Sequence, residues 1–195
     1  PHRNDRWAQS HTGHRVAWIW ALKMGRSARH IGLTGGIGSG KTTFGLLLKI
    51  HGAAIIDSDQ IAKQVTGPRG DAMDAIAQTF GREYVDDTGA LNRARMRQLA
   101  YSTPQAKSAL EAIVHPLVAQ GLQMQTQAAL AAGKNCLVFD VPLLVESGER
   151  WRRQVDWVCV VDCQTETQIQ RVMARSALTR PEIEGIMAQQ ATRAQ

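Results

Sequence analysis

The stretch from Gly35 to Thr42 is the feature that most limits what this chain can be. It fits the pattern G-x-x-x-x-G-K-[ST] of a phosphate-binding loop, or P-loop. A short apolar run, residues 30–33, precedes it, and an apolar helical pattern, residues 44–50, follows it. Glycines let successive backbone N–H groups point at phosphate oxygens, and the helix adds its positive N-terminal end. This context favours a nucleoside triphosphate site over a glycine-rich turn that matches by chance.

Each residue type in such a loop has a chemical role. Lys41 can reach the β- and γ-phosphates, and the Thr42 hydroxyl can ligate Mg²⁺. We therefore expect a nucleoside triphosphate and Mg²⁺ as cofactors. The residues expected to bind the nucleotide are Gly35, Gly36, Ile37, Gly38, Ser39, Gly40, Lys41, Thr42 and Thr43.

The net charge of +6 at first suggests a nucleic-acid partner, but the charge is unevenly spread. Residues 1–30 hold six bases and one acid, whereas the other 165 residues hold 17 bases and 16 acids. The body of the protein is therefore nearly neutral, and we expect no nucleic-acid partner.

Length, cysteines and hydropathy set further limits. With 195 residues the chain can form one domain, or one domain with an inserted lobe. The three cysteines have no paired spacing, and two of them lie in apolar runs typical of core positions, so we expect a reducing compartment and a cytoplasmic protein. No apolar run approaches the length of a membrane span, so no membrane association is expected.

Residues 1–29 are unlike the rest of the chain. Residues 16–22 form a short apolar run, but no small-residue cleavage site of a secretory signal follows it. A basic transit peptide is a second interpretation. We favour a third, in which Met24 is the natural start, residues 1–29 are disordered or upstream sequence, and the nucleotide-binding domain spans 30–195.

Two aspartates follow a short apolar strand, residues 53–56. Because ligands bind at the carboxyl ends of strands in open α/β sheets, Asp57 and Asp59 are well placed for a base or a metal ligand. The alternative is that an aspartate caps the next helix. Both can hold for different aspartates.

Residues 61–132 have mostly helical patterns and predict an inserted helical lobe that could cover a substrate. Asn92 can cap one helix, and Thr103 followed by Pro104 starts another. Pro116 interrupts the apolar stripe of the latter, so we expect a kink or break near His115. His115 could contact a ligand there or could be a packed, hydrogen-bonded histidine.

Two more buried strands follow, at residues 136–140 and 155–162. The first ends in Asp140, which can hold Mg²⁺ as a Walker-B acid does, or can cap the strand end. Thr165 and Gln168 fit a capping box, as do Thr179 and Glu182. Arg171 and Arg175 share a helix face, an arrangement that suits a triphosphate but is also common on solvated surfaces.

Taken together, these motifs resemble the dephospho-CoA kinase family. The resemblance covers nearly everything from Ile31 to Gln195. Besides the P-loop, it rests on Asp57-Ser58-Asp59, Gly89-x-Leu91-x-Arg93, His115-Pro116-Leu117, Pro142-Leu143-Leu144-Val145-Glu146 and the arginine helix.

The resemblance implies a P-loop NTPase-type fold, a three-layer α/β/α arrangement with a parallel sheet. It implies that ATP phosphorylates the ribose 3′-hydroxyl of dephospho-CoA, giving CoA and ADP. Asp59 matches the family's base, Lys41 and Arg171 complete the catalytic set, and Arg175 also contacts ATP from a lid at about residues 171–182. Thr42 and Asp140 would hold Mg²⁺, and the helical lobe at about 61–132 matches the CoA-binding domain. Substrate contacts are expected from Asp57, Arg93, His115, Pro142, Leu143 and Glu146.

The chain departs from the family pattern in three places. Asn92 stands where the family usually has aspartate, and residues 1–29 are not part of the pattern. The family also continues past Gln195 with a last sheet strand and an adenine loop, so we expect the sheet to lack an edge strand and the fold to be weakened.

Alternatives remain at this stage. They are another small-molecule P-loop kinase of the nucleoside or nucleotide class, a truncated inactive fragment, a P-loop switch protein, and a nucleic-acid binder that uses the basic tail. We expect a monomer and leave an oligomer open.

Overall fold

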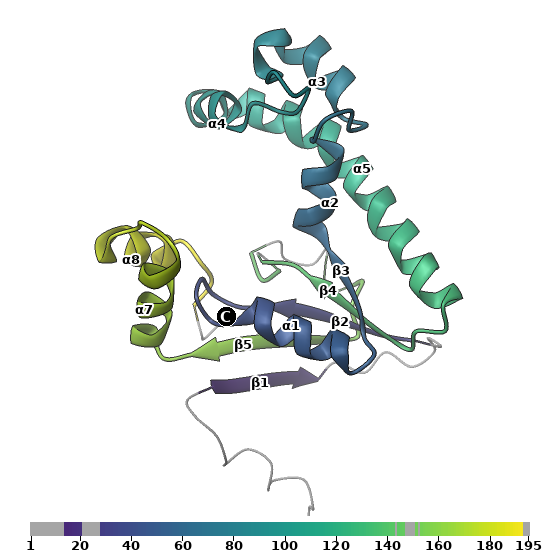
Figure 1. The fold of residues 1–195 in the computed structure, drawn as a ribbon, viewed down its shortest axis with the longest axis vertical. Helices are drawn as coiled ribbons and strands as arrows, with labels where there is room; N and C mark the ends of the chain where they lie inside the picture. Colours follow the sequence, from purple (N-terminus) through teal and green to yellow (C-terminus); the bar gives the residue numbers. More distant parts are fainter. Residues whose placement is uncertain (1–13, 21–27, 143, 147–150, 152, 193–195) are drawn as a thin grey trace, which may run out of the picture. The chain divides into compact units, whose positions relative to one another are not determined.

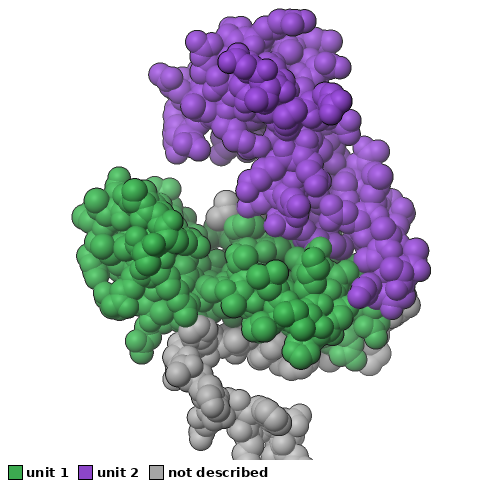
Figure 2. Space-filling model, viewed as in Figure 1, with its two compact units in different colours: residues 1–55, 135–195 green, residues 56–134 purple. Residues whose placement is uncertain are grey.

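The computed structural model describes residues 14–20, 28–142, 144–146, 151 and 153–192. The chain divides into two compact units. Unit 1 comprises Pro1–Ile55 and Asn135–Gln195, and unit 2 comprises Ile56–Lys134 (Figure 2). The lobe expected at about 61–132 lies within unit 2.

Unit 1 is built on a five-stranded sheet with the order β1-β5-β2-β4-β3. β2 (Arg29–Thr34) pairs in parallel with both β4 (Cys136–Asp140) and β5 (Trp157–Cys163). β3 (Ala54–Asp57) neighbours β4 and passes from unit 1 into unit 2. The expected α/β fold with a parallel sheet is thus confirmed.

Apolar side chains of the strands form the core of unit 1. Ile31, Leu33, Val138 and Cys159 are buried together. α1 (Lys41–Ile50) covers one face of the sheet, and its Phe44 and Leu48 pack against this cluster (Figure 1). The parallel strands read as nearly continuous apolar runs because they are buried in the middle of the sheet.

β1 (His14–Trp20) pairs antiparallel with β5, in a register that runs from His14 opposite Cys163 to Trp20 opposite Trp157. The sequence analysis predicted that residues 1–29 lie outside the fold. For residues 14–20 this prediction is wrong, because they form a strand of the sheet. Pairing satisfies backbone groups that an open edge would leave unpaired, which is the physical reason for an apolar segment to add there. The predictions for residues 1–13 and 21–27 lie outside the described residues.

Unit 2 is helical. Its elements are α2 (Ser58–Val65), α3 (Met73–Phe80), the 3₁₀ turn η1 (Arg82–Tyr84), α4 (Arg93–Ser102) and α5 (Pro104–Ala131). A second core gathers around the buried Met73, Ile76 and Met96. As predicted, Asn92 caps α4, since its Oδ1 accepts the N–H of Arg95 at 3.1 Å, and Pro104 starts α5.

α5 runs for 28 residues as one helix with Pro116 inside it. Of the two outcomes expected near His115, a break is therefore wrong, and a kink stays a prediction. The proline removes one hydrogen bond, to the carbonyl of Ala112, but Ala112 is exposed and water can replace the lost donor. Val114 and Leu117, on either side of the proline, pack against the same core. Tertiary packing therefore keeps the helix continuous. Among the helices that the structure describes, none combines the length and the hydropathy needed to cross a bilayer.

The last two helices that the structure describes are α7 (Thr165–Arg175) and α8 (Arg180–Ala188) of unit 1, which share a small core of Ile169, Val172 and Ile183. The predicted capping box at the start of α8 is confirmed, because Glu182 accepts the backbone N–H of Thr179 at 2.7 Å. The box predicted for α7 is wrong. Gln164 stands at its N-cap without a side-chain hydrogen bond.

The contact between α2 and α5 requires glycine at position 121. A Cβ atom there would lie 2.6 Å from Cγ2 of Ile61, a side chain that is only 2% exposed. Overpacking costs about 1–3 kcal/mol, which exceeds the helix-propensity gain of about 1 kcal/mol. We expect Gly121→Ala to lower the free energy of unfolding, measured by chemical denaturation.

Gly185 in α8 is the matched control, because a Cβ atom there meets nothing within 4 Å. Gly185→Ala should raise stability by about 0.5–1 kcal/mol. Equal gains for the two substitutions would contradict close packing at Gly121.

Candidate active site

The P-loop joins the carboxyl end of β2 to the first turn of α1 (Figure 1). Gly40 stands at the N-cap with φ +100°, and Gly38 has φ +73°. A Cβ atom at Gly38 would also lie only 2.5 Å from the carbonyl oxygen of Gln168. Glycine is needed at Gly38 for both reasons, conformation and space. The loop has the strand-loop-helix context that the motif requires.

Lys41 and Asp140 form an ion pair beside the P-loop. Lys41 is the first residue of α1, and Asp140 ends the neighbouring strand β4. Their side chains are 16% and 13% exposed, so the pair is largely withdrawn from water. Asp140 is therefore a partner of the P-loop lysine rather than a simple strand-end cap. Thr42 and Thr43 are exposed in the first turn of α1.

Helix α7 holds the P-loop from a second side. The Arg171 guanidinium donates from Nη1 to the carbonyl oxygens of Ser39 at 3.2 Å and Gly38 at 3.4 Å. Gln168 is 5% exposed, and its Nε2 donates to the carbonyl oxygen of Ile37 at 2.8 Å. The backbone N–H of Ile37 donates to Oε1 of Gln190 at 3.0 Å.

Sequence reasoning missed both glutamines as site residues. It interpreted Gln168 as a helix cap, whereas the side chain is used to fix the loop. The spacing with Arg171, one turn along the same helix, was the available signal. Arg175 lies one further turn along α7 and is exposed.

The segment after β4 packs beside the same strand edge. The carbonyl oxygen of Pro142 accepts the hydroxyl of Thr34 at 3.1 Å. Glu146 accepts the backbone N–H of Ala191 at 2.7 Å, directly after Gln190. Glu146 thus secures the segment that follows α8. Leu143 lies outside the described residues.

In unit 2, the two aspartates take different positions. Asp57 is the N-cap of α2, and its Oδ1 accepts the N–H of Gln60 at 2.9 Å. Asp59 is exposed in the first turn of the same helix. Asp57 therefore caps α2, as one of the two interpretations expected, and a chemical role for Asp59 stays a prediction.

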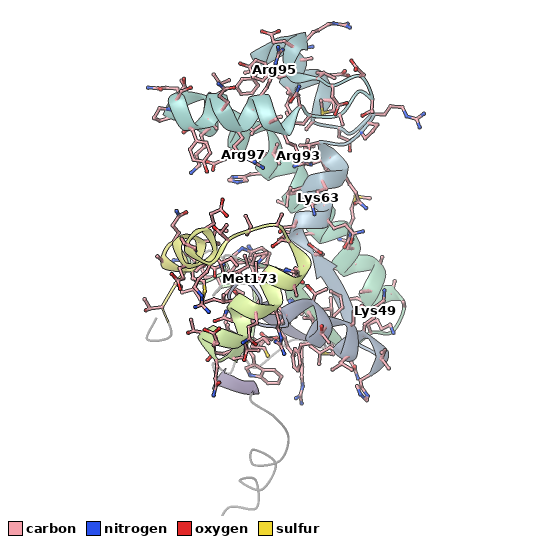
Figure 3. All side chains as sticks on the ribbon, turned by 60° about the vertical axis from the view of Figure 1, so that its left-hand side comes forward. Lys49, Lys63, Arg93, Arg95, Arg97 and Met173 are labelled. Atoms are coloured by element: carbon pink, nitrogen blue, oxygen red, sulfur yellow. The ribbon has the colours of Figure 1, made fainter. Side chains whose placement is uncertain are left out.

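The remaining predicted residues of unit 2 are Arg93 and His115. Arg93 donates from Nη2 to the hydroxyl of Thr66 at 2.9 Å, whereas His115 is exposed on α5. Arg93 also lines a cavity of about 500 Å³, together with Lys63 and Thr66. Figure 3 labels Lys63 and Arg93 in this unit. Sequence reasoning missed Lys63 and Thr66.

Cys159 and Cys163 are buried, and Cys136 is half-buried against the core of unit 1. Burial raises the pKa of the Cys159 thiol to about 11 and also raises the pKa of Cys136. A buried thiol with a raised pKa remains protonated and is a poor nucleophile. Within the described part of the chain, no three His, Cys, Asp or Glu side chains gather to hold a metal ion.

Comparisons with a family model and with individual proteins point to the same family. The family described as dephospho-CoA kinase matches residues 29–195. The chain is 55% identical to a protein named dephospho-CoA kinase from Albidiferax ferrireducens over 168 residues, which cover 86% of this chain and 79% of the relative. It is also 55% identical to the protein of that name from Bordetella pertussis over 164 residues, covering 84% of this chain and 75% of the relative.

Solved structures have the same fold. The crystal structure of TT1252 from Thermus thermophilus has a TM-score of 0.71 and 34% identity, and covers 85% of this chain and 82% of that one. A dephospho-CoA kinase from Campylobacter jejuni, at 19% identity, shows likeness of fold alone, with a TM-score of 0.54 over 84% of this chain and 80% of that one.

The position of Gln168 predicts a stability effect. Gln168→Leu leaves the part-buried carbonyl oxygen of Ile37 without its donor, so the free energy of unfolding should fall by about 1–3 kcal/mol. Chemical denaturation measures this. Gln170, exposed on the same helix, is the control, and Gln170→Leu should change stability by less than about 0.5 kcal/mol. Similar losses in both variants would mean that Gln168 does not hold the loop.

Proposed function

The chain belongs to the dephospho-CoA kinase family, and on that premise we propose how its residues divide the reaction between them. Members of the family carry out the ATP-dependent phosphorylation of dephospho-CoA in CoA biosynthesis. We propose the ribose 3′-hydroxyl as the acceptor. The observation that carries the proposal is the P-loop between β2 and α1, with Lys41 and Asp140 beside it.

The P-loop and the first turn of α1 would bind the ATP phosphates through backbone N–H groups and the positive helix end. Lys41 would exchange its partner Asp140 for phosphate oxygens. The exchange is favourable because a triphosphate carries more negative charge than one carboxylate. The hydrogen bonds from Arg171 to the carbonyl oxygens of Ser39 and Gly38 would keep the loop in shape during this exchange of partners.

The donor set near Lys41 fits Mg²⁺. The exposed hydroxyl of Thr42 and the carboxylate of Asp140 are oxygen ligands, and Mg²⁺ in kinases is commonly held by one or two such groups and by substrate phosphates. Bound there, Mg²⁺ would neutralise charge on the β- and γ-phosphates.

Arg171 and Arg175 of α7 would lie toward the transferred group. Two cations at i and i+4 repel each other, and the repulsion is relieved when an anion lies between them. The γ-phosphoryl group in transfer is such an anion, and stabilising its charge is the main task of a kinase site. The segment at about 171–182 would move as a lid, excluding water that otherwise hydrolyses ATP.

Asp59 would accept the proton of the ribose hydroxyl. It lies in the first turn of α2, where the capping bond of Asp57 fixes the start of the helix. Asp57 would thereby position Asp59. We keep Arg93, His115, Pro142 and Glu146 as proposed substrate contacts, and the cytoplasm as the proposed compartment.

The first test measures ADP release with Mg-ATP, with and without dephospho-CoA, and identifies the product. We expect release that depends on dephospho-CoA and a product identical to authentic CoA. Asp59→Asn should lower kcat by about 10²- to 10⁴-fold, because the base is lost while the side-chain shape is kept. Asp74→Asn, in the first turn of α3, is the control and should retain full activity. Substantial activity in Asp59→Asn would remove Asp59 from the role of base.

Metal dependence is a separate prediction. Chelation with EDTA should abolish ADP release, and added Mg²⁺ should restore it. Asp140→Asn should require a higher Mg²⁺ concentration for half-maximal rate, since an amide is a weaker ligand than a carboxylate. The control is again Asp74→Asn. An unchanged Mg²⁺ requirement in Asp140→Asn would exclude Asp140 as a ligand.

A further inference from the structure

One face of α2 carries both Asp59, the proposed base, and Lys63, which lines a cavity of unit 2. Asp59 and Lys63 are four residues apart on this helix and both are exposed, so they lie on the same face, about 6 Å apart along the axis. The opposite face carries Ile61, which is buried against α5 at Gly121. Lys63 thus continues the exposed face that begins at Asp59.

The cavity lies at the far end of this face. It measures about 500 Å³ and is lined by Lys63, Thr66, Gly67, Asp86, Ala90, Leu91, Asn92 and Arg93. All of these residues belong to unit 2. Lys63 comes from α2 and Arg93 from α4, and both are labelled in Figure 3.

The guanidinium of Arg93 is held in place. The Thr66 hydroxyl that accepts from Arg93 donates in turn to the carbonyl oxygen of Ala62 at 2.6 Å, and Thr66 is only 4% exposed. The backbone of Thr66 also accepts the N–H of Leu91 at 2.9 Å, which joins α2 to the segment before α4. A cation fixed in this way loses little freedom when it binds an anion.

The cavity is suited to negative charge. Lys63 and Arg93 contribute two cations, and the positive N-terminal end of α4 begins beside them at Asn92. α4 contains no acidic residue, and Arg97 lies one turn beyond Arg93 (Figure 3). Asp86 is the acid among the described lining residues.

Asp86 is committed to its own turn. Its Oδ1 accepts the Thr88 hydroxyl at 2.6 Å, the N–H of Thr88 at 2.9 Å and the N–H of Ala90 at 3.1 Å. The hydrogen bond from the Thr88 side chain is the largest of the causes that lower the pKa of Asp86, so its charge stays in place. Asp86 therefore keeps its negative charge, which is stabilised by three donors of its own turn, and the described lining sets two cations, Lys63 and Arg93, against this one acid.

We propose that Lys63 and Arg93 bind the 5′-diphosphate of dephospho-CoA, a subsite that selects acceptors carrying this group. This inference rests on the proposed function. The 3′-hydroxyl and the 5′-diphosphate belong to the same ribose, one sugar ring apart, and Asp59 and Lys63 are one helical turn apart. A diphosphate bound at Lys63 and Arg93 therefore brings the 3′-hydroxyl to Asp59.

The test compares Lys63→Ala with the unchanged chain, using two acceptors, dephospho-CoA and adenosine, which lacks the diphosphate. We expect the KM for dephospho-CoA to rise about ten-fold or more, the effect of losing one charge-assisted contact, with the KM for ATP unchanged. The ratio of kcat/KM for dephospho-CoA over adenosine should fall by a similar factor. Lys63→Arg, which keeps the charge, should recover most of the loss.

Lys107→Ala is the control. Lys107 also belongs to unit 2 and its side chain is 66% exposed, but it does not line the cavity. Its KM values should match those of the unchanged chain. Thermal unfolding of each variant checks that the fold is retained.

Two outcomes would overturn the subsite. An unchanged KM for dephospho-CoA in Lys63→Ala would show that this cation does not bind the diphosphate. Equal losses with both acceptors would show a general role in place of selection. If the unchanged chain converts no dephospho-CoA at all, the proposed function fails and the subsite fails with it, a result distinct from the other two.

Discussion

The parallel pairing of β2 with both β4 and β5 is the constraint on which the site in unit 1 depends. Because the three strands point the same way, their carboxyl ends meet at one edge of the sheet. The P-loop leaves β2 at that edge, Asp140 ends β4 there, and β5 leads into α7. The apolar core of Leu33, Val138 and Cys159 maintains the pairing, so the position of the charged groups follows from the burial of uncharged ones.

Around the P-loop, side-chain amides do much of the positioning. Gln168 and Gln190 bind the carbonyl oxygen and the N–H of Ile37, and Arg171 binds the next two carbonyl oxygens. Each of these bonds crosses more than 100 residues of chain, so the loop keeps its shape only when α7 and the segment after α8 are in place. A loop rich in glycine is flexible alone, and this network offsets that flexibility.

Unit 2 uses a different principle, helix packing around a small residue. Gly121 lets α2 approach α5 closely, and the approach leaves the opposite face of α2 exposed with Asp59 and Lys63. Thr66 then connects α2 to Arg93. The packing of one face therefore decides what the other face can present to a substrate.

The amino-acid sequence alone was enough to predict the P-loop, the α/β class, the Asn92 cap of α4 and the capping box of α8. These features depend on interactions between residues close in the chain, or on the spacing of apolar residues along it. The three-dimensional structure was needed to identify the partner of Asp140, the role of Gln168, the continuity of α5 through Pro116 and the cavity that Lys63 and Arg93 line together. The physical reason is the same in each case. A hydrogen bond or contact between residues distant in sequence can override a local signal, and a single sequence does not record which distant residues meet.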